Sequence, residues 1–95
     1  MTNPERMTLF QSALIAIHNM QKAEPGYPPF VSIHNQILYL MALVSGQPVD
    51  HQNLAKINLG YIAMREVETQ NEDAANLFYR VSAEVDQLRK ELHIS

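Results

Sequence analysis

The chain contains no cysteine and no tryptophan, and only seven of its 95 residues are lysine or arginine. Without cysteine it can form neither a disulfide nor a thiolate nucleophile, which is compatible with a reducing compartment. The few basic residues are spread thinly and form no basic stripe, so nucleic acid is not an expected partner. The net charge of -3 offers no attraction to anionic lipid and favours a basic partner.

Neither a targeting segment nor a membrane span is recognisable in the sequence. Residues 1–6 lack the basic and apolar regions of a secretory signal peptide. The longest apolar run covers residues 37–44. A membrane-spanning helix needs roughly 18 apolar residues, so this run is far too short. We therefore expect a cytoplasmic protein that has no membrane partner.

The residues that carry most enzyme chemistry are absent or scattered. The chain has no glycine-rich phosphate loop and no serine nucleophile motif. The four histidines fall in different regions without the spacing of metal ligands; they are His18, His34, His51 and His93. The sequence therefore predicts no catalysis, no bound metal and no cofactor.

Proline and glycine divide the chain into four segments. Residues 25–29 and 46–48 are strong breaks, and residues 69–71 are a softer one. Each segment carries apolar residues at helical spacing, and none shows the period-two alternation of a strand. The predicted fold is all-α, a small antiparallel bundle of about four helices that forms one domain over residues 1–95. The helices are expected at about residues 3–23, 28–45, 51–68 and from 71 onward.

The third segment is expected to form one continuous helix that begins after Asp50. Its main buried stripe is predicted to contain Leu54, Ile57, Tyr61 and Met64. Gly60 lies inside this helix, where glycine costs about 1 kcal/mol relative to alanine. A glycine at such a position indicates that another side chain or backbone packs closely against it.

The second and fourth segments differ in how they distribute apolar residues. The second is apolar over much of its circumference, so we expect it to be the central helix. The fourth has a near-heptad apolar seam and a polar outer face, which is predicted to expose Glu84, Asp86, Arg89 and Lys90.

Acidic residues gather where the third helix is expected to end and the fourth to begin. Between Glu66 and Tyr79 there is no lysine or arginine, and there are four acids: Glu66, Glu68, Glu72 and Asp73. Two interpretations remain open. The acids complement the positive end of a helix dipole and face solvent, or they form a surface that docks a basic partner.

Four short stretches resemble a family of immunity proteins. They are Pro-Gly-Tyr at 25–27, the run 36–40, Leu54 with the run 57–66, and the helix start at 72–75. The strongest is Leu-Gly-x-Ile-Ala-x-basic-Glu at 59–66. The resemblance covers about residues 13–81. Members of this family neutralise type VI secretion effectors that hydrolyse NAD(P), and relatives accompany other interbacterial toxins. Delivery by type VI secretion or by contact-dependent inhibition stays open.

The resemblance implies a small helical protein that binds the catalytic domain of its cognate toxin and blocks the active site. It implies no catalysis and no cofactor. We expect the toxin contacts among the acids and the residues just before them: Tyr61, Arg65, Glu66, Glu68, Glu72 and Asp73. Tyr61 is a candidate anchor, because tyrosine is common at binding hot spots. Arg65 and Glu66 form either an internal ion pair or partner-facing groups.

Two other classes of protein fit the same sequence. One is a non-catalytic helical adaptor or regulatory module, with a homodimer formed through the spare apolar surface of the second and fourth helices. The other is a small helical enzyme whose acids bind a metal. A binding role suits the chain better, because no nucleophile or cofactor motif accompanies the acids.

Overall fold

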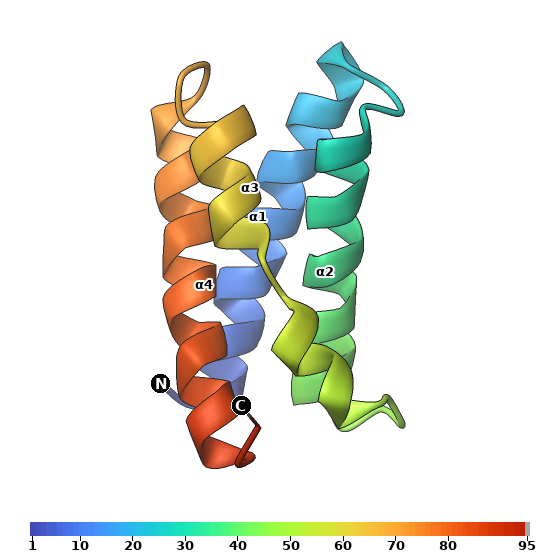
Figure 1. Ribbon diagram of the computed structural model, residues 1–95, viewed down its shortest axis with the longest axis vertical. Helices are drawn as coiled ribbons and strands as arrows, with labels where there is room; N and C mark the ends of the chain where they lie inside the picture. Colours follow the sequence, from blue (N-terminus) through green and yellow to red (C-terminus); the bar gives the residue numbers. More distant parts are fainter. Residues whose placement is uncertain (95) are drawn as a thin grey trace.

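The computed structural model describes residues 1–94, and every regular element within them is helical. Along the long axis α1 runs up, α2 down, η1 with α3 up, and α4 down (Figure 1). The predicted all-α bundle is thereby confirmed. The elements are α1 (Asn3–Ala23), α2 (Pro28–Val44), the 3₁₀ helix η1 (His51–Lys56), α3 (Leu59–Glu66) and α4 (Glu72–Glu91).

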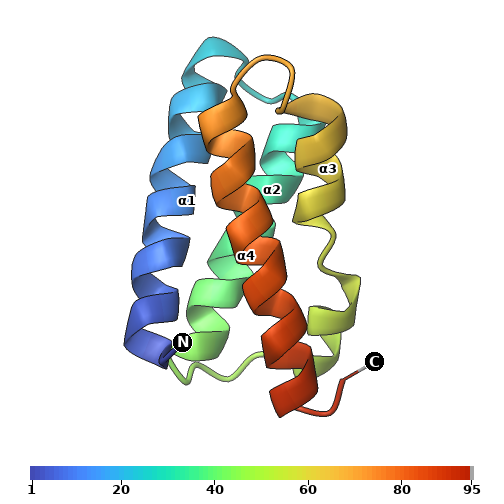
Figure 2. The same cartoon turned by 90° about the vertical axis from the view of Figure 1, so that its left-hand side faces the viewer.

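The helices pack as neighbours around one core. Helix α1 contacts both α2 and α4, and α3 packs mainly against α4. Viewed from the side, α4 lies in front, with α1 on one side of it and α3 on the other (Figure 2). Within residues 1–94, no helix combines the length and the apolar character that crossing a membrane requires.

Side-chain caps begin two of the long helices. At α1, the Thr2 hydroxyl accepts from the Glu5 amide, and the Glu5 carboxylate accepts from the Thr2 amide. This reciprocal pair is a capping box, which satisfies backbone donors that the first turn leaves free. At α4, Oδ1 of Asn71 accepts from the Ala74 amide at 3.0 Å. The fourth helix therefore starts after Asn71, as the sequence predicts.

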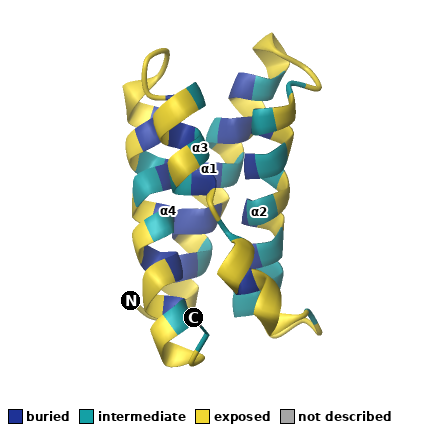
Figure 3. Ribbon diagram, in the orientation of Figure 1, coloured by how far each residue is buried: buried dark blue, intermediate teal, exposed yellow. Residues whose placement is uncertain are grey.

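The core takes one apolar face from each helix, and these faces meet inside the bundle (Figure 3). Phe10, Phe30 and Phe78 are its largest buried side chains and come from α1, α2 and α4. Helix α2, which the sequence predicts as the central helix, buries Ile33, Ile37 and Leu40 but exposes Val31 and Leu38 on its outer side. The other fully buried large residues are Ile17, Ile33, Ile37, Leu40, Leu54, Leu59, Val67, Val81 and Val85.

The prediction of one continuous third helix is wrong. The chain forms the 3₁₀ helix η1, then becomes extended at Ile57, and starts α3 only at Leu59. This break frees backbone carbonyl groups that a continuous helix would bond. The guanidinium of Arg89 on α4 donates to three of them, the carbonyls of Leu54 (3.1 Å), Ala55 (3.4 Å) and Ile57 (2.8 Å).

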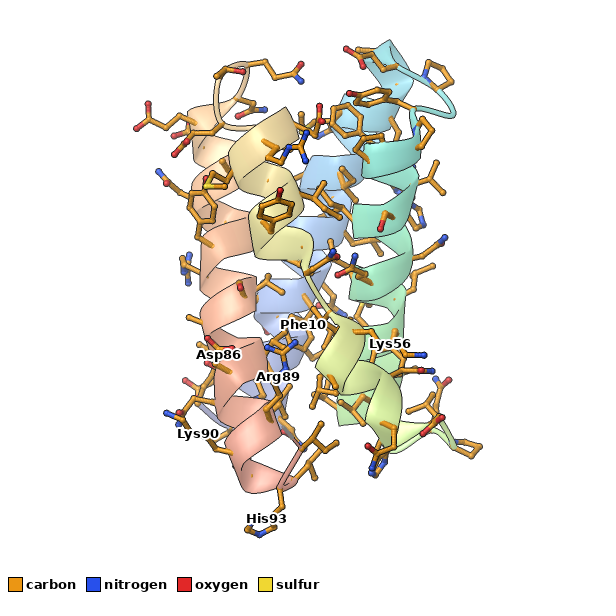
Figure 4. All side chains as sticks on the ribbon, in the orientation of Figure 1. Phe10, Lys56, Asp86, Arg89, Lys90 and His93 are labelled. Atoms are coloured by element: carbon orange, nitrogen blue, oxygen red, sulfur yellow. The ribbon has the colours of Figure 1, made fainter. Side chains whose placement is uncertain are left out.

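Arg89 therefore does not lie on a purely solvent-facing surface. Its side chain points toward η1, as Figure 4 shows, and it is partly buried. Across the break, Gln36 makes a second link, because its amide donates to Oδ1 of Asn58 and accepts from the Asn58 backbone amide, both at 2.8 Å. Together these two side chains replace the helical hydrogen bonds that the break removes.

The break also changes which residues of the third segment are buried. Tyr61 and Met64 are 55% and 51% exposed, so the buried stripe predicted from Leu54 through Met64 is wrong in its second half. Helix α3 instead buries Leu59 and Ala63, followed by Val67 just after it. A new helix that starts at Leu59 sets its own phase, and a face extrapolated from residue 54 no longer applies.

Glu84 also differs from its prediction, because it is buried and does not lie on an outer polar face. Its carboxylate accepts from Nε of Arg6 at 2.7 Å. Arg6, which is 4% exposed, also bonds the Glu91 carboxylate and Oδ1 of Asn3. Burial of a charged carboxylate is tolerated here because a buried cation pairs with it.

Candidate partner-binding surface

Helix α3 is short, and contacts from α4 and α2 hold it in place. Its Gly60 allows a close approach of α4, because a Cβ at that position would lie 2.7 Å from Oγ of Ser82. The close packing that this glycine predicts is confirmed, although Gly60 occupies the first turn of α3 and not a helix interior. At the other end of α3, the Tyr27 hydroxyl donates to the Glu66 carboxylate at 2.6 Å.

Glu66 thus faces the α1–α2 connection and is half-buried. Its hydrogen bond to Tyr27 raises the pKa of that phenol, so the hydroxyl stays protonated and keeps donating at neutral pH. The Glu66 carboxylate, one of the predicted contact groups, therefore already has an internal partner.

The outward side of α3 presents two large apolar side chains beside a cation. Tyr61 and Met64 are both more than half exposed. The Arg65 guanidinium donates to the Tyr61 hydroxyl at 3.2 Å and lies 5.6 Å from the centre of its ring. Arg65 forms no ion pair with Glu66 within residues 1–94, so the internal-pair alternative does not describe this structure.

We call the exposed side chains of Tyr61, Met64, Arg65 and Glu68 the α3 surface. A small hollow of about 260 Å³ lies next to it, lined by Pro29, Tyr61, Ile62, Arg65 and Glu66. Exposed tyrosine, methionine and arginine are side chains that protein interfaces favour at their centres. The hydrogen bond and cation–π contact within the surface hold Tyr61 and Arg65 in one arrangement, which reduces the entropy lost on binding.

The predicted acids that follow α3 in the chain lie at the same end of the molecule as the rest of the α3 surface. Glu68 lies in the loop after α3, and Glu72 and Asp73 lie in the first turn of α4, all exposed. None of the ion pairs formed among residues 1–94 includes them. Burial raises the pKa of Tyr79, and the charge of nearby Glu68 raises it further. Both earlier interpretations of these acids are therefore compatible with the structure.

No metal-binding triad is found among the residues that the structure describes. Within residues 1–94, no three histidine or acidic side chains come together in positions that could hold a metal ion. The acids at the α3–α4 end instead lie beside exposed apolar groups. This arrangement is chemically suited to contacting another protein.

The family comparison bears directly on this surface. The Tsi6 family model matches residues 5–87, which include nearly all of α1 and the whole of α2 and α3. The chain belongs to the Tsi6 family. Tsi6 is a family of type VI secretion immunity proteins, so a protein toxin is the implied partner. No curated protein and no solved structure gives a significant match to this chain.

Several residues that carry the family resemblance have a structural task in this chain. Gln36 bonds Asn58 across the break, Gly60 admits α4, and Glu66 bonds Tyr27. All of these contacts position α3. Sequence reasoning missed Met64 as an exposed residue, and the signal that would have found it is its spacing of three from Tyr61 on a helix that restarts at Leu59.

Proposed function

We propose that this Tsi6-family chain binds the catalytic domain of its cognate interbacterial toxin through the α3 surface and blocks the toxin's active site. The observation that carries the proposal is the exposure of Tyr61 and Met64 on a helix that the fold holds at both ends. Exposed apolar groups on a rigid element are favourable anchors, because little ordering entropy is lost when they are buried.

The acids beside this surface support a toxin whose active site is basic. We propose that the toxin hydrolyses NAD(P), which carries a negatively charged pyrophosphate. A cleft that binds pyrophosphate presents positive potential, and Glu68, Glu72 and Asp73 present the opposite sign at one end of this chain. Such complementarity speeds association and orients the inhibitor over the cleft.

In this proposal the chain inhibits by covering the toxin's active site and complementing its charge, so it needs no catalytic group or cofactor. Its place of action is the compartment in which a delivered toxin meets cellular NAD(P). We therefore propose that the chain works in the cytoplasm as a non-enzymatic inhibitor.

The test is co-expression with the toxin domain encoded beside this chain, with cell survival, NAD(P) levels and co-elution measured together. The expected result is survival, preserved NAD(P) and a stable complex. Survival and a complex without any NAD(P) effect would keep the immunity role and remove the substrate assignment. If the cells die and no complex elutes, the proposal is wrong.

A homodimeric adaptor is the second function that an observation favours. Helix α2 contains no charged residue, and it exposes Val31 and Leu38 on its outer side. An open groove of about 650 Å³ runs between α2 and the η1 region, with Val31, Tyr39 and Ile57 among its lining residues. Analytical ultracentrifugation of the isolated chain tests this alternative, since a monomer at high micromolar concentration would exclude it.

A further inference from the structure

Two histidines that are far apart in the sequence lie next to each other in the fold. His18 is on α1 and His34 is on α2, and their ring centres are 4.7 Å apart with the ring planes inclined by 47°. His18 is exposed and His34 is half-buried, so a small solute can reach the pair. Spacing along the chain cannot reveal this pair, because the contact crosses two antiparallel helices.

A neighbouring amide determines which nitrogen of His34 carries its proton. Nδ1 of His34 lies 2.8 Å from Oε1 of Gln21. Since an amide oxygen only accepts, Nδ1 must donate, and Nε2 is left with its lone pair. Histidines that bind metals use this arrangement, in which one ring nitrogen donates to an acceptor and the other coordinates the ion.

The separation of the rings is compatible with a shared ion. Two imidazoles that bind one ion at about 2.0–2.1 Å, with a near-tetrahedral angle between them, have ring centres about 5 Å apart. The observed separation of 4.7 Å is close to this value. Beside His18, a hollow of about 490 Å³ opens on the surface of α1, with Asn19 and Gln21 among its lining residues.

We propose that His18 and His34 together bind one borderline divalent cation, with water completing its coordination. Imidazole nitrogen favours Cu²⁺ and Zn²⁺ among such ions, and Cu²⁺ should bind more tightly than Zn²⁺. Lys22 lines the same hollow, and its positive charge opposes a cation. The site uses α1 and α2 and shares no residue with the α3 surface, so its failure would not affect the proposed toxin binding.

The experiment is a titration of the untagged chain with CuCl₂ and with ZnCl₂ at neutral pH, followed by calorimetry and by NMR of the imidazole nitrogens. We expect one ion per chain, with chemical-shift changes at His18 and His34. The substitutions His18→Gln and His34→Gln should each weaken binding at least about tenfold, because a single imidazole remains. Replacing the orienting group by Gln21→Leu should weaken it by about tenfold.

His51→Gln and His93→Gln are the matched controls, since both residues are exposed histidines outside the pair. These variants should bind as the unmodified chain does. Circular dichroism without metal checks that every variant folds. The proposal is overturned if the double variant His18→Gln with His34→Gln binds as tightly as the unmodified chain, or if the shifts occur at His51 or His93.

Discussion

The two ends of the bundle use charge in opposite ways. At the end near the N-terminus, Arg6 is buried and pairs with Glu84 and Glu91, which ties α1 to α4. At the opposite end, Glu68, Glu72 and Asp73 are exposed and belong to none of the ion pairs within residues 1–94 (Figure 1).

This contrast separates the charges that hold the fold together from those that are free for a partner. Removing one member of a buried pair leaves an uncompensated charge in the interior, and this is costly. An exposed acid adds little to stability. The acids near α3 are therefore free to match the charge of the proposed partner, whereas a change at Arg6 or Glu84 should destabilise the fold.

Removing the buried cation should have the largest effect on stability. Arg6→Met leaves the Glu84 carboxylate buried without its partner, and should lower the free energy of unfolding by about 3 kcal/mol. Urea denaturation followed by circular dichroism measures the change. The control Arg80→Met, at an exposed arginine outside the ion pairs of residues 1–94, should stay within about 0.5 kcal/mol. Equal stability of the two variants would remove the distinction between the ends.

Removing the exposed tyrosine should act on binding and not on folding. Tyr61→Ala should weaken the complex with the toxin domain by about 30-fold or more, which is the scale of an aromatic hot spot. Calorimetry of the complex gives the affinity, and thermal melting of the free chain should show no comparable loss. Leu38→Ala is the control, because Leu38 is similarly exposed but lies on α2. A loss of affinity in the control alone would move the binding surface to α2.

Filling the space at Gly60 tests how tightly α3 is held. Gly60→Ala places a methyl group against Ser82 and should destabilise the chain by about 1–2 kcal/mol. Ser82→Gly removes the obstructing atoms but has its own cost inside α4, so both single variants and the double variant are needed. The double variant should be more stable than the sum of the single effects predicts. If the effects of the two single substitutions on stability simply add, α3 can move away from α4 freely.

Reversing one acid near α3 should slow association. Glu68→Lys should lower the association rate with the toxin domain severalfold at low ionic strength, and the effect should fade as salt is added. Stopped-flow or surface plasmon resonance gives the rates. Asp86→Lys makes the same charge change on α4 towards the other end, where it also removes the exposed Arg89–Asp86 ion pair (3.1 Å), and should alter the rate less. Equal slowing by both variants would mean that net charge, and not its location, sets the rate.

The smallest effect concerns pH and the exposed partner of Arg6. The hydrogen bond from Arg6 lowers the pKa of Glu91 below its usual value of 4.5. Because the pKa is lower in the folded state, the pair stabilises the fold fully above that usual value and loses its contribution as the pH falls through the lowered pKa. Glu91→Gln should therefore reduce the acid-induced loss of stability. Denaturation curves from neutral pH to pH 3 test this, and an unchanged pH dependence would contradict it.

Much of the fold was predictable from the residues. The breaks at residues 25–29 and 46–48 follow from proline and glycine chemistry, and both prove to connect helices. The close approach at Gly60 followed from the cost of glycine in a helix. The break before Leu59 was not predictable, because no proline or glycine marks it. The side chains that replace the lost hydrogen bonds come from α2 and α4.

The candidate site was predicted only in part, because contacts between distant segments also decide which of its residues are exposed. Tyr61, Glu68, Glu72 and Asp73 are exposed and available, and their contact with a toxin stays a prediction. The Glu66 carboxylate is turned inward by its hydrogen bond with Tyr27, which lies in the α1–α2 connection, 39 residues earlier in the chain. Met64 joins the exposed group because the phase of α3 is set at Leu59.

Sequence alone was enough to predict the helical class, the approximate ends of three helices and the acidic character of one end, since periodicity, caps and charge act within a few residues of each other. Tertiary structure alone decided the break before α3, the burial of Glu84 against Arg6, and the meeting of His18 with His34. Each of these three features depends on contacts between different helices, and the energy that selects it exists only once the helices have packed.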